Sequence, residues 1–275
     1  MTERDIENFR TFFADYVRSF YSHVPEDQKN ITLKEEHSRL VCRTIRLLAG
    51  KQGLAQDKIL IAETIGLFHD IGRFPQYARY RTFRDSLSVN HGNLGVEILT
   101  EKNVLGPLPG EEQRIVLNAV RFHNAFSVPH LPDAEDVFFL RLVRDADKLD
   151  IWRIFLGFFA GKNNDMASAA GLGLPETPGY SREAIACLRD RKSVALSLLK
   201  NMNDFKLTQL SWVYDLNFSS SFALLAENDF IRRLVALLPD TEEIREVEAL
   251  LSDYVSRMRK AAPAERGYAA GRQGT

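Results

Sequence analysis

The chain has 275 residues, of which 45% are hydrophobic and 27% charged, an ordinary globular composition with enough length for one large domain or two small ones. The net charge of −1 gives no indication of nucleic-acid or membrane binding. No apolar run reaches the roughly 18 residues of a membrane span, and the acidic N-terminal residues are not typical of a signal peptide. The two cysteines, Cys42 and Cys187, fit no ligand spacing and indicate small core residues of a reduced, cytoplasmic protein.

The first predicted helices have strongly apolar faces. Residues 4–22 carry aromatic side chains at helical spacing, which favours core packing over a cofactor site. Thr32 and Glu35 have the spacing of a capping box, so a second helix is predicted to start there.

A third helix is predicted over residues 57–71. Gly66 lies one turn before His69 and permits a neighbouring helix to approach closely. Gly72 is a typical helix stop, and Pro75 is predicted to prevent the helix from resuming. Residues 73–90 are polar, aromatic and basic, which is typical of a loop or a short helix.

Helices are also predicted from His91 and from Glu111. A long helix over residues 133–161 is apolar nearly all round and is therefore expected to be central. It nevertheless carries three aspartates, which need partners in so buried a helix: Asp145, Asp147 and Asp150.

The last part of the chain follows a Gly-, Asn- and Ala-rich loop. Further helices are predicted at about 181–203, 206–216, 218–237 and 241–261, although 206–218 also allows a short strand. We therefore expect an all-α fold. Its predicted divisions are residues 1–162 (core about 30–160), a helical extension at 163–262 and a disordered tail at 263–275.

Histidines and aspartates recur on the apolar faces of these helices. A lone core histidine is usually a hydrogen-bonded bystander, but four on four helices, beside a His-Asp pair and a buried aspartate, indicate a metal site. The histidines are His37, His69, His91 and His123, and the pair is completed by Asp70. Nitrogen and oxygen ligands without thiolate suit Mn, Fe, Zn, Ni or Mg. Six ligands can hold two ions with Asp70 between them. Helical facing does not choose between Asp145 and Asp147.

The order His37, His69-Asp70, Asp147 resembles the H…HD…D signature of the HD superfamily of metal-dependent phosphohydrolases. The resemblance covers about residues 30–160 and implies an all-α HD-domain helical bundle with the metal in a helix-lined cleft. It implies that His91 and His123 are the extra histidines of dinuclear members, and that Asp147 is the ligand of the Asp-x-Asp-Lys segment. Leu at position 33 and the lack of a following Gly-Tyr-Pro argue against the cyclic-dinucleotide phosphodiesterases.

The resemblance implies hydrolysis of a small phosphate ester, for example a nucleotide, by a metal-activated water. Asp70 and Lys148 are the predicted catalytic residues, and charge developing on phosphate oxygens needs fixed cations. The predicted substrate-binding residues are Arg73, Lys148, Arg79, Arg81, Arg84 and Tyr77. A solvated surface loop explains the arginines equally well, and Tyr77 either stacks on a base or packs.

Two alternatives stay open. The same ligand order resembles the diiron oxygenases of the superfamily, and a non-catalytic sensor that retains the metal is a third interpretation. The basic residues near the ligands favour the hydrolase. A small phosphorylated molecule is the expected partner, without nucleic-acid duplex or membrane. The substrate, the metal and the oligomeric state, including a homo-oligomer, are left open by the sequence.

Overall fold

A computed structural model describes residues 1–159 and 173–261 of the protein. The regular secondary structure in these described residues is helical, with no strand among them, which confirms the all-α prediction. None of the described helices is long and apolar enough to cross a bilayer. The α-helices are α1 (Glu3–Arg18), α2 (Pro25–Lys51), α3 (Gln56–Phe68), α4 (Arg73–Tyr80), α5 (His91–Glu101), α6 (Gly110–Phe122), α7 (Ala134–Phe159), α8 (Arg182–Arg189), α9 (Met202–Ser211), α10 (Ser219–Glu227), α11 (Phe230–Val235) and α12 (Glu242–Lys260). Short 3₁₀ helices are η1 (Asp85–Leu87), η2 (Leu196–Leu198) and η3 (Trp212–Asp215).

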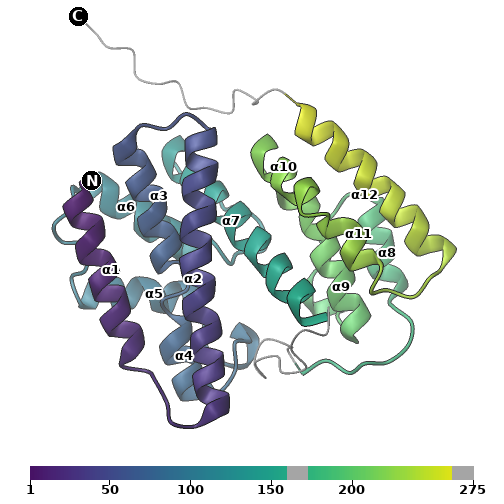
Figure 1. Ribbon diagram of the computed structural model, residues 1–275, viewed down its shortest axis with the longest axis horizontal. Helices are drawn as coiled ribbons and strands as arrows, with labels where there is room; N and C mark the ends of the chain where they lie inside the picture. The colour runs from purple at the N-terminus through teal and green to yellow at the C-terminus, as the bar shows by residue number, and fades with distance from the viewer. Residues whose placement is uncertain (160–172, 262–275) are drawn as a thin grey trace, which may run out of the picture.

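Helix α7 is the central element, as its apolar sequence predicted. Figure 1 shows it between the N-terminal helices α1–α6 and the C-terminal group α8–α12. It packs against α2, α3 and α6 on one side and against α10 and α11 on the other. On the C-terminal side, Trp152 contacts the rings of Trp212 and Phe230. A helix packed on both sides needs apolar residues around most of its circumference, which explains its composition.

The aromatic face of α1 is core, as predicted. Phe9 and Phe13 are buried and pack against Phe68 at the end of α3. The close approach predicted at Gly66 is also present. A Cβ there would lie 2.9 Å from Ile45 Cγ2 and 3.0 Å from the Cα of Cys42, so α2 and α3 pack with no room for a side chain.

Two predicted helix boundaries in the first half were wrong, and so was the expectation that Pro75 prevents a helix from resuming. Helix α2 begins at Pro25, so Thr32 lies inside it, because proline is well tolerated at a first helical position. Helix α3 ends at Phe68, and α4 resumes at Arg73 with Pro75 in its first turn, where the missing N–H costs nothing. Gly72 has ordinary helical angles (φ −68°). A glycine is needed at position 72 because the backbone of His91 packs against it: a Cβ there would lie 2.2 Å from the His91 carbonyl oxygen.

The C-terminal helices are shorter than predicted. The helix predicted over 181–203 ends at Arg189, shortly before Arg191, whose φ of 57° is not helical. The helix predicted over 218–237 is broken at Asp229, whose φ is 53°. Residues 206–218 contain the end of α9 and η3 in place of a strand. Helix α12 agrees with the prediction over 241–261, and the Thr241 side chain caps its first turn. Most of the predicted loop, the boundary at 162–163 and the tail lie outside the described residues.

Candidate metal centre

Four predicted ligand side chains meet between α2, α7 and the turn that follows α3, and we call them the first cluster: His37, His69, Asp70 and Asp147. His37 Nε2 lies 3.0 Å from Asp147 Oδ1 and 3.2 Å from His69 Nε2. Asp70 Oδ2 is 3.6 Å from His37 Nε2 and 3.7 Å from His69 Nε2. The histidines and Asp70 are buried, whereas the Asp147 side chain is 18% exposed.

The other oxygen of Asp70 faces a second cluster, formed with His91 and His123. His91 Nε2 and His123 Nε2 are 3.0 Å apart, and they lie 3.3 and 3.6 Å from Asp70 Oδ1. All three side chains are buried. The structure therefore brings the six predicted ligand side chains together and places the Asp70 carboxylate between two groups of histidines.

Two of the histidines are oriented by backbone carbonyls. His69 and His123 directly follow α3 and α6, where the last helical carbonyls lack intrahelical partners. Each Nδ1 lies 2.8 Å from the carbonyl three residues earlier, that of Gly66 or Val120. Because a carbonyl only accepts, Nδ1 carries the proton and Nε2 presents a lone pair to the cluster.

The other two histidines are oriented by carboxylates. His37 Nδ1 is 2.7 Å from Asp150 Oδ2, one turn after Asp147 on α7. His91 Nδ1 is 2.8 Å from Asp85 Oδ2, on η1. Each cluster thus has one histidine held by a carbonyl and one held by a carboxylate. Such partners fix the ring and strengthen the other nitrogen as a metal ligand.

The spacing of the donor atoms fits divalent ions. Bonds of about 2.1 Å place neighbouring ligands of one ion about 3.0–3.4 Å apart in octahedral or tetrahedral geometry. The closest pairs in the two clusters are 3.0 and 3.0 Å, with further contacts of 3.2–3.8 Å. His37, His69 and Asp70 are one group able to hold an ion, and Asp70, His91 and His123 are another.

The charge states follow from burial and from neighbouring groups. Burial lowers the pKa of His69 to about 3, and burial with Arg73 lowers that of His91, so both rings are neutral as ligands must be. For His37, burial and the charge of Lys34 act to lower the pKa. The hydrogen bonds that its ring makes with Asp147 and Asp150 outweigh both effects, and the net result is a pKa raised to about 9. Burial opposes ionisation of Asp70, yet the ammonium of Lys34 holds the pKa of this carboxyl well below the usual range.

Asp145 is separated from the metal centre by its contacts. Its carboxylate accepts hydrogen bonds from the backbone N–H groups of Asn217 and Phe218 and from the Asn217 side chain. It therefore ties the segment before α10 to α7. Of the two aspartates that helical facing left open, Asp147 is the one that faces His37.

The predicted catalytic Lys148 points to a different group. The Nζ atom of Lys148 lies 2.8 Å from Asp215 Oδ2, which also pairs with Arg144. Burial lowers the pKa of Lys148. Arg73 lies closer to the ligands, with Nε 3.4 Å from Asp70 Oδ1. Its Nη1, however, donates to the Phe83 carbonyl and to Asp85. These contacts do not favour a substrate role for Lys148, and that role stays a prediction.

The remaining predicted substrate residues lie along α4 and after it. Tyr77 is buried and its hydroxyl donates to Asp27, so the ring packs inside the protein and presents no face for a base. Arg81 pairs with Asp27 and Arg79 lies over the Tyr80 ring, both exposed. The backbone of Arg84 turns into η1. None of the contacts described for these residues reaches a ligand side chain.

Three residues next to the ligands were missed by the sequence reasoning as parts of the site. Asp150 and Lys34 each lie three residues from a ligand on the same helix, and this spacing was the available signal. Lys34 Nζ is 2.8 Å from Asp70 Oδ2. Asp85 had no such signal, because the turn from η1 to α5 brings it to His91.

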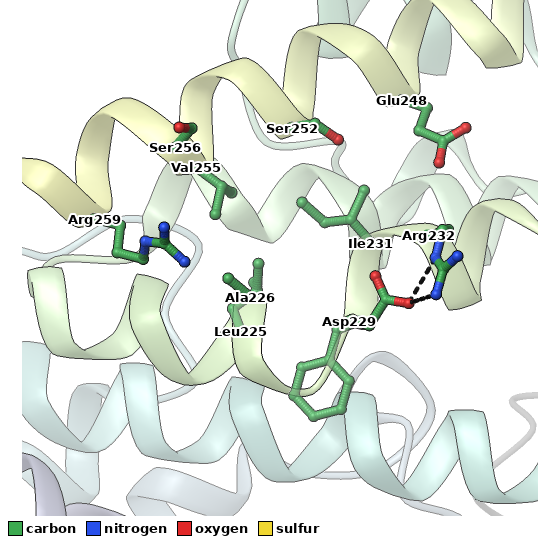
Figure 2. Close-up of a pocket in the computed structure, with 11 residues that line it drawn as sticks. Leu225, Ala226, Asp229, Ile231, Arg232, Glu248, Ser252, Val255, Ser256 and Arg259 are labelled. Carbon is green, nitrogen blue, oxygen red and sulfur yellow. Dashed lines mark hydrogen bonds and ion pairs between the residues drawn. The ribbon is translucent and has the colours of Figure 1, made fainter.

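A separate hollow of about 260 Å³ lies among α10, α11 and α12 (Figure 2). Leu225, Ile231 and Val255 line it, and at its edge Asp229 pairs with Arg232. It shares no residue with the two clusters. Its lining gives no reason to place the chemistry there.

A helical bundle in which four histidines and Asp147 surround the Asp70 carboxylate defines a protein with a candidate metal centre. Residues 35–152 match the family model of the HD domain, a range that includes all six ligand candidates. This match confirms, over residues 35–152, the resemblance to the HD domain that the order of histidines and aspartates indicated. Comparisons with curated proteins and with solved structures gave no match.

Proposed function

We propose that this protein is a dinuclear metal-dependent phosphohydrolase acting on a small phosphate ester. The observation that supports it most is the position of Asp70, whose two oxygens face separate pairs of histidines at 3.3–3.7 Å. One carboxylate between two such groups is an arrangement that suits a pair of divalent ions. When bound, such ions lower the pKa of a coordinated water and polarise a phosphoryl oxygen.

The chain's own residues supply the remaining requirements. His37, His69 and Asp147 would hold one ion and His91 and His123 the other, with Asp70 shared. The hydrogen bonds at the four Nδ1 atoms keep the rings fixed, so little reorganisation accompanies the reaction. Lys34 and Arg73 place two positive charges beside Asp70, which favours binding of a phosphate dianion.

The donor set also suits the second candidate function, a diiron oxygenase on a small polar substrate, because two irons accept the same histidine and carboxylate ligands. The ligands therefore do not separate hydrolysis from oxygenation. The cations beside Asp70 favour hydrolysis, since a phosphorylated substrate needs them.

The test is a panel of phosphate esters, including nucleotides, assayed anaerobically with protein loaded with Mn²⁺ or Fe²⁺. Release of inorganic phosphate is expected, and Asp70→Ala should abolish it because that variant removes the shared carboxylate. Activity that requires oxygen together with reduced iron would overturn the hydrolase proposal and leave the ligand geometry unchanged.

A further inference from the structure

Lys34 lies one turn before His37 on α2, so both side chains reach the same side of the helix. Its Nζ is 2.8 Å from Asp70 Oδ2, the oxygen that faces the first cluster. The side chain of Lys34 is 15% exposed, and that of Asp147 is 18% exposed. Lys34 and Asp147 are thus partly exposed, whereas His37, His69 and Asp70 are buried.

Other cations near the ligands make their hydrogen bonds to groups that are not ligands. Arg73 donates to Asp85 and to the Phe83 carbonyl, and Lys148 pairs with Asp215. Metal ions in the two clusters would leave these partners in place. Lys34 differs, because its hydrogen bond is to Asp70, the carboxylate shared by both clusters, whereas Arg73 Nε lies 3.4 Å from that carboxylate.

Competition at Asp70 gives Lys34 a reason to exchange partners. An ammonium and a divalent ion on one carboxylate repel each other, strongly where water is largely excluded. The Phe83 ring, 5.3 Å from Nζ, keeps the ammonium near the cluster through a cation–π contact. Lysine also has a flexible stem and three rotatable donors, which suit transfer to another anion.

We propose that Lys34 binds the phosphate of the substrate, exchanging Asp70 for a phosphate oxygen. This assignment rests on the proposed function and gives Lys34 the role that the sequence favoured for Lys148 and Arg73. It makes two predictions of opposite sign. Removing the charge should weaken binding of phosphate, and it should strengthen binding of metal because a competing cation is lost.

The experiment compares wild-type protein with Lys34→Met, Lys34→Arg and the control Lys58→Met. Lys58 is a partly exposed lysine on α3 that pairs with Glu135. Mn²⁺ affinity is measured by calorimetric titration of metal-free protein. Binding of inorganic phosphate to the Mn²⁺-loaded protein is then measured by calorimetry and by ³¹P relaxation.

Lys34→Met is expected to weaken phosphate binding about tenfold or more, as loss of a charged hydrogen bond does. Mn²⁺ affinity should rise in this variant, because the competing cation is lost. Lys34→Arg should retain most of the phosphate affinity, and Lys58→Met should change neither quantity. Unchanged phosphate binding in Lys34→Met, a loss matched by Lys58→Met, or weakened Mn²⁺ binding would overturn the assignment.

The outcomes also separate this assignment from the proposed function. If no phosphate ester is hydrolysed but phosphate binding depends on Lys34 as expected, the hydrolase proposal fails and the anion-binding role stands. If esters are hydrolysed while phosphate binding and turnover are unaffected by Lys34→Met, the hydrolase stands without Lys34.

Discussion

The two carboxylates that orient histidines should each control the affinity of one metal site. Asp150 contacts His37 in the first cluster, and Asp85 contacts His91 in the second. Replacing either with Asn keeps the shape but removes the charge, and the amide can turn to donate to Nδ1 and so favour the wrong tautomer. Loss of such a partner typically weakens metal binding about 10–100-fold, or about 1.4–2.7 kcal/mol.

The two variants should differ in their effect on folding. Asp150 otherwise pairs with Arg153, whose side chain is 49% exposed, so this ion pair contributes little. Asp85 also accepts hydrogen bonds from Arg73, Gln76 and Asn124. Asp85→Asn should therefore lower the melting temperature of the metal-free protein more than Asp150→Asn does.

Assignment to a site requires backgrounds in which only one cluster can bind. His91→Ala disables the second cluster, and calorimetric titration with Mn²⁺ then reports the first. In that background Asp150→Asn should weaken binding and Asp85→Asn should not. In a His37→Ala background the order should reverse. Equal weakening by both variants in both backgrounds would refute the reasoning, because it would show that they act through the fold.

Two further predictions concern positions whose neighbours are known. Gly72→Ala should destabilise the protein by about 3 kcal/mol or more in thermal unfolding, because the new Cβ would lie 2.2 Å from a backbone oxygen. The control is Gly50→Ala, where the new Cβ would have nothing within 4 Å, so that this variant should be neutral or slightly stabilised. Asp147→Asn should lower Mn²⁺ affinity with little loss of stability, whereas Asp145→Asn should chiefly destabilise the protein, because it replaces an oxygen that accepts buried hydrogen bonds. The opposite pattern in calorimetric and thermal measurements would reverse the two assignments.

The sequence predicted those parts of the fold and site that depend on local pattern. The helical periodicity and the apolar character of α7 were sufficient for the fold class and for its central helix. The four histidines could be selected because each is a polar residue at a position where apolar packing is expected. The close contact at Gly66 followed from its place on the same face as His69.

The errors arose where tertiary contacts override local signals. Thr32 and Glu35 have a capping-box spacing, but α2 had already started at Pro25. The basic residues after His69 lie near the ligands in sequence, yet hydrogen bonds direct Arg73 partly toward Asp85. Asp145 and Asp147 are indistinguishable by apolar periodicity in a helix packed on both sides. The family resemblance selected Asp147, and the structure separates the two because Asp147 contacts His37 whereas Asp145 binds the segment before α10.

The pairing of one carbonyl-held and one carboxylate-held histidine in each cluster bears on how such a centre can evolve. The carbonyls of Gly66 and Val120 belong to the backbone, so side-chain substitution leaves these oxygens in place. Asp85 and Asp150 are encoded side chains, and one codon change alters the basicity of one ring. Each metal position therefore combines an invariable ligand orientation with an adjustable one. Metal preference can drift at either position while the other is conserved.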